Sequence, residues 1–254
     1  MRLVTLNLQH GRPSGGGRID LDQLAAAVRA LDPDVLALQE VDHRQPRTQL
    51  ADLTAVAGQA MGAVSFRFAA SLLGTPGRTW VAATDQDVGT AASFGTALLS
   101  RYPVRQWEVL RLPAVGPHLT LPWPGSDQGM LLGEEPRTAV VAQLDSPVGP
   151  LVVASTHLSV VPVANRRQLR TAAHRLLGFP DPVVIMGDLN LTGRIPARVT
   201  GYRPLVRQWT FPAVRPLVQL DHILLRGRLG PVLGSEARRL PLSDHRALLV
   251  DLGS

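Results

Sequence analysis

Short apolar runs, separated by polar, glycine and proline residues, dominate the chain and predict a protein rich in β-strands. The runs have the length of strands and contain many Val and Leu residues, which is typical of strands buried in a sheet. The predicted strands cover residues 3–7, 34–38, 64–69, 94–99, 104–112, 138–144, 151–158, 183–186, 220–225, 232–237 and 247–252.

Three amphipathic segments predict helices between these strands. The first begins after Asp20, with Gln23 three residues later as a capping box, and ends at Asp32. The second covers residues 49–60 and the third covers residues 164–177. The apolar side of the third helix is expected to consist of Leu169, Ala173, Leu176 and Leu177.

The mixture of strands and helices predicts a single α/β domain over residues 1–254. We expect a mixed sheet, or two stacked sheets, with helices outside. Residues 10–17 are rich in glycine but lack the GK[ST] sequence of a phosphate-binding loop, which favours a flexible linker. Residues 113–136, with many prolines and glycines, predict a long irregular loop.

Composition restricts the chemistry that the chain can perform. The 254 residues include no cysteine, which excludes disulfides and thiolate metal sites, so any metal must use oxygen or imidazole ligands. Such ligands favour Mg²⁺ or Mn²⁺. All basic residues other than histidine are arginines, and the net charge of +6 favours anionic partners such as nucleic acid or lipid phosphate.

The sequence contains no signal-peptide pattern and no apolar stretch long enough for a transmembrane helix. We therefore expect a cytoplasmic protein.

Polar residues that can bind a metal or a phosphate follow most of the predicted core strands. The stretch 183–190 is the clearest case, because the buried run VVIM ends in Gly187-Asp188-Leu189-Asn190. Taken alone, this stretch fits an Asx turn as well as it fits a site. The other strand ends carry Asn7, Glu40, His157, Asp221-His222 and Asp244-His245. Buried charges are costly unless they are paired or bound to metal. The presence of such residues at the ends of most predicted core strands therefore favours a functional site.

These motifs resemble those of the metal-dependent endonuclease/exonuclease/phosphatase superfamily, in the family's order and over the whole chain. The matching segments are TLNLQHG with Asn7, LQEVD with Glu40, GTALLSR at residues 95–101, EPRTAVV with Arg137, STHL with His157, GDLN with Asp188 and Asn190, residues 210–212, LDHILL with Asp221, and LSDHRALLVDL with Asp244 and His245. The resemblance implies a four-layer α/β/β/α sandwich, with the active site at one end of two packed sheets.

The resemblance also implies roles for individual residues. Glu40 corresponds to the principal magnesium ligand, with Asn7 beside it and Asp244 as a second carboxylate. Asp188 and Asn190 would orient the attacking water and contact the scissile phosphate.

The remaining roles concern the histidines and their neighbours. His157, His245 and Arg137 would bind the phosphate oxygens, and Asp221 would hold His245 in its charged form. Either Asp188 or His245 would be the general base.

Three departures separate the chain from particular branches of the family. His157 stands where apurinic endonucleases have a tyrosine-centred motif, and Asp42 stands where they usually have lysine. Phe94 occupies roughly the place of the glutamate that supports the histidine in pancreatic-type DNases. The partner of His157 is therefore open, with Asp85 and Asp87 as candidates.

A divalent-metal-dependent phosphodiesterase that acts on nucleic acid is the leading hypothesis for the function. The basic surface supports it, as do the arginines of the third predicted helix, although such a helix is commonly a solvated face. A phospholipid, sugar phosphate or inositol phosphate is the alternative substrate, because residues 113–136 carry apolar side chains that could rest on lipid. A non-catalytic nucleic-acid-binding module of the same fold is the third hypothesis.

Overall fold

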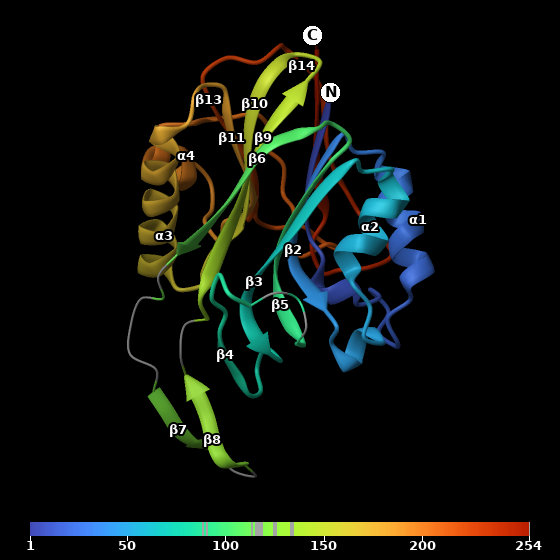
Figure 1. Cartoon of the computed structure of the whole chain (residues 1–254), viewed down its shortest axis with the longest axis vertical. Helices are drawn as coiled ribbons and strands as arrows, with labels where there is room; N and C mark the ends of the chain where they lie inside the picture. Colours follow the sequence, from blue (N-terminus) through green and yellow to red (C-terminus); the bar gives the residue numbers. More distant parts are fainter. Residues whose placement is uncertain are drawn as a thin grey trace.

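The computed structural model describes residues 1–87, 89, 91–112, 114, 119–123, 126–132 and 135–253. Two sheets pack face to face, and helices cover the outer face of each (Figure 1). The first sheet has the strand order β14 (Val232–Arg238), β15 (Ala247–Leu252), β1 (Arg2–Asn7), β2 (Val35–His43), β5 (Ser93–Ser100), β3 (Ser65–Gly74) and β4 (Trp80–Ala82). The second has the order β12 (Arg203–Pro204), β13 (Asp221–Arg226), β11 (Val183–Asp188), β10 (Gly149–His157), β9 (Arg137–Ser146) and β6 (Val104–Leu112).

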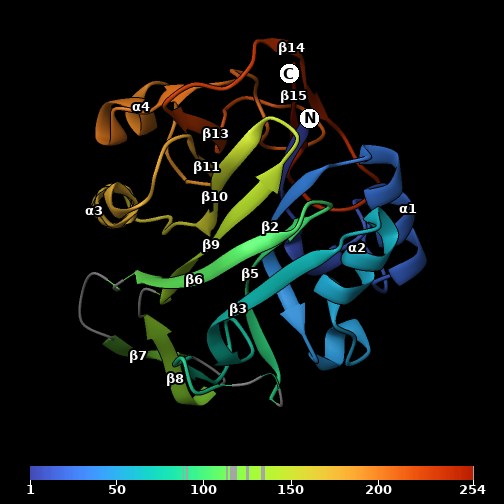
Figure 2. The ribbon, with the colours of Figure 1, turned by 45° about the horizontal axis from the view of Figure 1, so that its top comes forward.

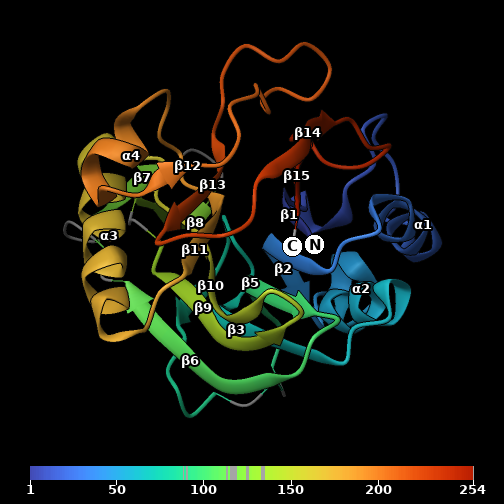
Figure 3. The same cartoon turned by 90° about the horizontal axis from the view of Figure 1, so that it is seen from above.

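The helices complete the four predicted layers, as the view from above shows (Figure 3). The helices α1 (Leu21–Leu31) and α2 (Leu53–Met61) cover the first sheet. The helix α3 (Pro162–Arg175) covers the second sheet, and α4 (Ile195–Thr200) lies against α3. Within the described residues, no helix combines the length and the apolar character that crossing a membrane requires.

Three apolar cores hold the layers together. The central core lies between the sheets and joins Leu3 and Val35 of the first sheet to Val153 and Val184 of the second. The other two cores lie between each sheet and its helices. Both termini lie together at one end of the sandwich (Figure 2), where the Leu252 amide donates to the carbonyl of Met1.

Strand periodicity places the key polar residues on the face between the sheets. In β11, Val184 and Met186 belong to the central core, so Asp188, two residues further, lies on the same face. By the same alternation, Asn7 shares a face of β1 with the core residue Leu3, and His157 shares a face of β10 with the core residue Val153. These three side chains therefore emerge at the end of the central core.

Every strand predicted from the pattern is present, but several other predictions need correction. The second helix begins at Leu53 rather than residue 49, because Asp52 caps it by accepting a bond from the Ala55 amide (3.0 Å). The third helix covers residues 162–175, and Leu177, expected to be buried, is 63% exposed after the helix ends.

Two segments predicted to be irregular have defined structure. The glycine-rich segment is no free linker, because Arg12 accepts a backbone bond from Ser243 (2.8 Å) and Ser14 donates to Pro241 (3.0 Å). Residues 113–136 contain a two-stranded hairpin, β7 (Leu119–Trp123) and β8 (Ser126–Leu132). The hairpin belongs to neither large sheet and extends beyond the body of the protein (Figure 1).

Replacing Gly187 by alanine should lower the free energy of unfolding by roughly 2–4 kcal/mol. Gly187 has φ 151°, and a Cβ there would overlap the carbonyl oxygen of Thr156 in the neighbouring strand. Gly178→Ala is the matched control, since nothing lies within 4 Å of the Cβ it would carry. Urea unfolding of both variants measures the difference, and equal losses would contradict the prediction.

Candidate functional site

The register of the strands brings the predicted site residues together. In the parallel pair β1–β2, Asn7 lies opposite Gln39, which places Asn7 beside Glu40. In the second sheet, Asp188 lies opposite His157 on one side and Asp221 on the other. Residues from five separated strands thus meet where the two sheets end.

A single amide links the carboxylates of the two sheets. Asn7 Nδ2 donates to Glu40 Oε1 (3.0 Å) and to Asp188 Oδ2 (3.0 Å). Asn7 Oδ1 accepts from the backbone amide of Gln9 (3.0 Å), which fixes the orientation of the side chain. The Asn7 side chain therefore turns its N–H groups, and not its oxygen, towards Glu40 and Asp188. In this orientation it holds the two carboxylates in place by hydrogen bonds. Its role as a direct metal ligand stays a prediction.

Asp188 is buried at the centre of this cluster. Burial, followed by the charge of Asp221, raises the pKa of Asp188 to about 7, although His245 and Asn7 oppose the shift. The other oxygen of Asp188 accepts from the backbone amide of Asn190 (3.0 Å). A buried carboxylate with a pKa near neutrality is suited to accept a proton at physiological pH.

His245 and Asp221 form a hydrogen-bonded pair, as predicted. His245 Nδ1 lies 2.9 Å from Asp221 Oδ2, and the other ring nitrogen lies 3.8 Å from Asp188 Oδ2. Burial alone would lower the pKa of His245, but the charge and hydrogen bond of Asp221, with help from Asp188 and Asp244, raise it to about 9. His245 is therefore an imidazolium at neutral pH.

The partner of His157 is Arg137, which sequence reasoning had assigned only to phosphate binding. Arg137 Nη1 lies 3.1 Å from His157 Nδ1. Asp85 and Asp87, the candidates from the sequence, are wrong, because Asp85 pairs with Arg111 (3.0 Å) and Asp87 accepts from the amide of Thr84 (2.6 Å).

The arginine determines the tautomer of His157. A guanidinium can only donate, so Nδ1 must accept, and the ring hydrogen is on Nε2. Burial, and then the charges of Arg137 and His245, lower the pKa of His157 well below its usual range. His157 is thus a neutral ring whose Nε2–H faces Asp188 Oδ2 at 3.5 Å.

Asn190 is held beside the same ring. Its Nδ2 donates to the carbonyl of Leu158 (3.0 Å) and lies 3.3 Å from His157 Nε2. The backbone carbonyl of Asn190 accepts a hydrogen bond from the Asn165 side chain in α3 (2.8 Å). Because Nε2 and Nδ2 both carry hydrogen in this tautomer, the two groups form a pair of donors suited to one oxyanion.

The donor set fits a hard divalent cation. Glu40 and Asp188 converge on the Asn7 amide, and one oxygen of Asp221 is buried without a hydrogen-bond partner. Burial raises the pKa of Glu40, and although the Asn7 hydrogen bond opposes this shift, the Asp244 carboxylate reinforces it. A cation would offset this crowding of negative charge, and oxygen-rich sets of this kind suit Mg²⁺ or Mn²⁺.

A second grouping of possible ligand atoms overlaps the first. Single ligand atoms of Asp188, Asp221 and His245 lie within 4.8 Å of one another, but His245 already uses one nitrogen to bind Asp221. Glu40 and Asp244 therefore stay the predicted metal ligands.

A pocket of about 390 Å³ is lined by six of the predicted site residues: Glu40, Arg137, His157, Asp188, Asn190 and His245. Phe211 and Val160 are among the lining residues that were not predicted as site residues. The Phe211 ring lies 4.8 Å from that of His245, and its position within the matched segment 210–212 was the available signal. Ser243 was also missed; its hydroxyl donates to the carbonyl of Asn7 (2.6 Å) and accepts from the amide of His245 (3.0 Å).

The layered sandwich and the cluster of carboxylates, amides and imidazoles at its strand ends are characteristic of hydrolases that act on phosphoester bonds. Residues 4–245 match the Endonuclease/Exonuclease/phosphatase family, and the chain belongs to this family.

Solved structures show the same fold. An endonuclease/exonuclease/phosphatase from Beutenbergia cavernae is 22% identical, with a TM-score of 0.69 over 100% of this chain and 72% of that one. A mannosyl-6-phosphatase from Bacteroides thetaiotaomicron is 14% identical, with a TM-score of 0.65 over 100% of both chains. TDP2 from Caenorhabditis elegans is 17% identical, with a TM-score of 0.64 over 100% of this chain and 74% of that one. No curated protein matches the sequence significantly.

The Asp221–His245 pair should make stability depend on pH. The pKa of His245 is about 9 in the folded protein against the ordinary 6.5 of a histidine, so its stabilisation is complete below pH 6.5 and is lost as the pH rises through 9. Between about pH 7.5 and about pH 9.5, the wild type should lose roughly 2 kcal/mol through this group. Urea unfolding in EDTA should show a smaller loss for Asp221→Asn, and parallel pH profiles would contradict the assignment.

The tautomer of His157 can be observed directly. Long-range ¹H–¹⁵N correlation spectra near neutral pH should show a neutral His157 ring with hydrogen on Nε2, because Arg137 occupies Nδ1. In Arg137→Leu this preference should weaken, whereas Arg111→Leu, which removes an arginine bound to Asp85, should leave it intact. A protonated or Nδ1–H ring in the wild type would exclude the arrangement.

Proposed function

We propose that the protein is a divalent-metal-dependent phosphodiesterase that hydrolyses nucleic acid. The observation that carries the proposal is the Asp221–His245 pair, whose outer nitrogen lies 3.8 Å from the raised-pKa carboxylate of Asp188. A proton acceptor and an imidazolium on the same pocket wall are the groups that water attack on a phosphate diester needs.

Asp188 and His245 carry the two proton transfers of the proposed reaction. Asp188, with its pKa of about 7, accepts the proton of the attacking water as the new P–O bond forms. His245, charged at neutral pH, neutralises the phosphorane and donates a proton to the leaving oxygen as the other P–O bond breaks. Of the two candidates for the general base, Asp188 is therefore favoured.

The remaining groups bind and orient the phosphate. The Nε2–H of His157 and the amide of Asn190 donate to one non-bridging oxygen, and Arg137, which lines the same pocket, adds a positive charge. Glu40 and Asp244 would hold the cation, with Asn7 orienting Glu40. A bound cation would polarise the phosphate and lower the pKa of the attacking water.

Charge favours nucleic acid as the substrate, since the chain carries a net charge of +6. One observation favours a phospholipid as the second candidate. Val160, at the pocket, is 70% exposed, and Val161 and Val163 beside it are also exposed. Val160 at the pocket, followed along the chain by the exposed Val161 and Val163, could contact an apolar leaving group.

A non-catalytic binding module of the same fold is disfavoured. Asp188, Asp221 and His245 are all buried, and buried charges without a use are costly. A module that only binds nucleic acid has no need of them.

Hydrolysis of bis-p-nitrophenyl phosphate tests the reaction. The wild type should be active with Mg²⁺ or Mn²⁺ and inactive in EDTA. Asp188→Asn, which keeps the shape of the side chain, should lower kcat by roughly 100- to 10,000-fold because the proton acceptor is lost. Arg29→Ala, an exposed residue of α1, is the control and should retain full activity.

Activity that survives EDTA or the Asp188→Asn substitution would refute the proposal. A panel of single-stranded DNA, RNA, sphingomyelin vesicles and inositol phosphates then ranks the substrates. A preference for sphingomyelin would favour the lipid candidate.

A further inference from the structure

A layer of buried polar side chains lies between the central apolar core and the candidate site. By strand alternation, each of these side chains shares the inner face of its strand with a residue of the central core. Gln39 follows Val35 and Ala37 on β2, and Ser155 follows Val153 on β10. The layer comprises six residues that are each at most 6% exposed: Thr5, Gln39, Ser71, Thr96, Thr138 and Ser155.

Gln39 joins the two sheets within this layer. Thr5 Oγ1 donates to Gln39 Oε1 (3.2 Å), and Gln39 Nε2 donates to Ser155 Oγ on the second sheet (3.4 Å). Thr5 lies two residues before Asn7, and Ser155 lies two residues before His157. The bridge through Gln39 therefore crosses the same gap between the sheets as the bridge through Asn7, one step nearer to the core.

The choice of an amide at this position has a physical cost. The Gln39 side chain is fully buried, and a buried amide is unfavourable unless its polar atoms are hydrogen-bonded. An apolar side chain of similar length would fill the same space without that requirement, but its contacts have no preferred direction. The hydrogen bonds of the amide instead define one position of β2 against β1 and β10.

Glu40 directly follows Gln39 in a distorted part of β2. Its φ of 53° is left-handed, and the pairing of β2 with β5 shifts between Leu38 and Val41. Neighbouring residues of a regular strand point to opposite faces, whereas this bulge lets Gln39 reach the layer between the sheets and Glu40 reach the pocket at the candidate site.

The left-handed conformation of Glu40 needs support from its surroundings, because it is strained for any residue other than glycine. Gln39 supplies that support immediately before it. The Gln39 carbonyl accepts from the Leu8 amide (2.9 Å), while the Gln39 side chain bonds to Thr5 and Ser155. Both the backbone and the side chain of Gln39 are therefore held where the strand is distorted.

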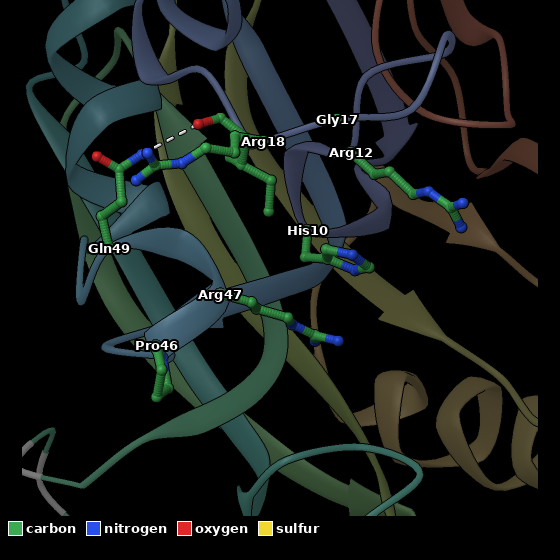
Figure 4. A pocket seen from close by; sticks show the side chains of 8 residues that line it. His10, Arg12, Gly17, Arg18, Pro46, Arg47 and Gln49 are labelled. Atoms are coloured by element: carbon green, nitrogen blue, oxygen red, sulfur yellow. Dashed lines mark hydrogen bonds between the residues drawn. The ribbon is translucent and has the colours of Figure 1, made fainter.

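Other contacts secure the end of β2 within the first sheet's half of the sandwich. Gln49 Nε2 donates to the carbonyl of Ile19 (3.0 Å, dashed in Figure 4) beside a pocket of about 470 Å³ between the segments that follow β1 and β2. Arg47 donates two hydrogen bonds of 2.7 Å to the buried carboxylate of Asp42. These four residues lie in β2 or in the segments after β1 and β2, whereas the bond from Gln39 reaches the second sheet.

We propose that Gln39 is a positioning residue for the reaction: its amide fixes Glu40, the predicted metal ligand, relative to Asp188, the proposed proton acceptor. Glu40 belongs to the first sheet and Asp188 to the second, so a shift of β2 against β10 changes their separation. The inference rests on the proposed function, because it concerns the alignment of two groups of that site.

Gln39→Met tests the proposal, since methionine keeps the length of the side chain and removes its hydrogen bonds. With bis-p-nitrophenyl phosphate and Mg²⁺, kcat should fall roughly 10- to 100-fold. KM should change little, because the second-sheet groups that bind the phosphate are untouched. Electron paramagnetic resonance of Mn²⁺ without substrate should show about tenfold weaker binding, which is a readout independent of hydrolysis.

Ser155→Ala removes the other end of the bridge and should also lower kcat and the affinity for Mn²⁺. The double variant Q39M/S155A should lose less than the product of the two single losses, because both substitutions remove the same hydrogen bond. Losses that multiply would show that the two residues act separately and would overturn the bridge.

Val250→Ala is the matched control for stability. Val250 is buried in the central core and lies opposite Leu3, at the other end of β1 from Asn7. The smaller side chain should lower the urea midpoint, whereas kcat and the affinity for Mn²⁺ should equal those of the wild type. If Gln39→Met follows this pattern, Gln39 has only a packing role and the proposal is overturned.

The Mn²⁺ measurement separates failure of this inference from failure of the proposed function. If Gln39→Met weakens Mn²⁺ binding but the wild type hydrolyses no phosphodiester, the proposed function fails while the positioning role stands. If the wild type is active and Gln39→Met keeps its kcat and its affinity for Mn²⁺, the positioning role fails while the function stands. A wild type that binds no Mn²⁺ overturns both.

Discussion

The Asn7 amide, which donates to one carboxylate from each sheet, is the interaction on which the site depends. Glu40 and Asp188 can share it only because the central core fixes the separation of the sheets. The apolar residues that share the inner face of the same strands, Leu3 before Asn7 and Val184 and Met186 before Asp188, form that core. Packing and charge placement are therefore two results of the same strand alternation, and a change in the core would move the carboxylates as well.

The two histidines of the pocket show how neighbours decide protonation. His245 has a carboxylate on its inner nitrogen and is charged, whereas His157 has a guanidinium there and is neutral. The pair thus provides an acid and a neutral donor within one pocket. An arginine in the supporting position also leaves fewer negative charges to balance than a carboxylate would leave, so more of the charge of a bound cation would stay available for a phosphate.

Strand alternation made much of the fold and of the site predictable from the sequence. The apolar runs located the core strands, and the polar residues after them located Asn7, Glu40, Asp188 and His245 in one cluster. The sequence pattern carries no comparable signal for which side chains of distant segments contact each other. The pairing of Arg137 with His157 depends on how β9 and β10 align, and nearby acidic residues suggested a different partner. Helix ends were missed where a local cap, such as Asp52, outweighed the periodicity.

The hairpin β7–β8 has an architectural consequence. It is inserted between β6 and β9, which pair directly through Leu112 and Arg137, so the chain leaves the second sheet and returns to the same place. An excursion with adjoining ends can lengthen, shorten or change sequence at little cost in loop entropy and without disturbing either sheet. Its base is Arg137, the arginine that orients His157. Evolution can therefore vary this appendage independently of the two sheets while keeping it attached beside the candidate site.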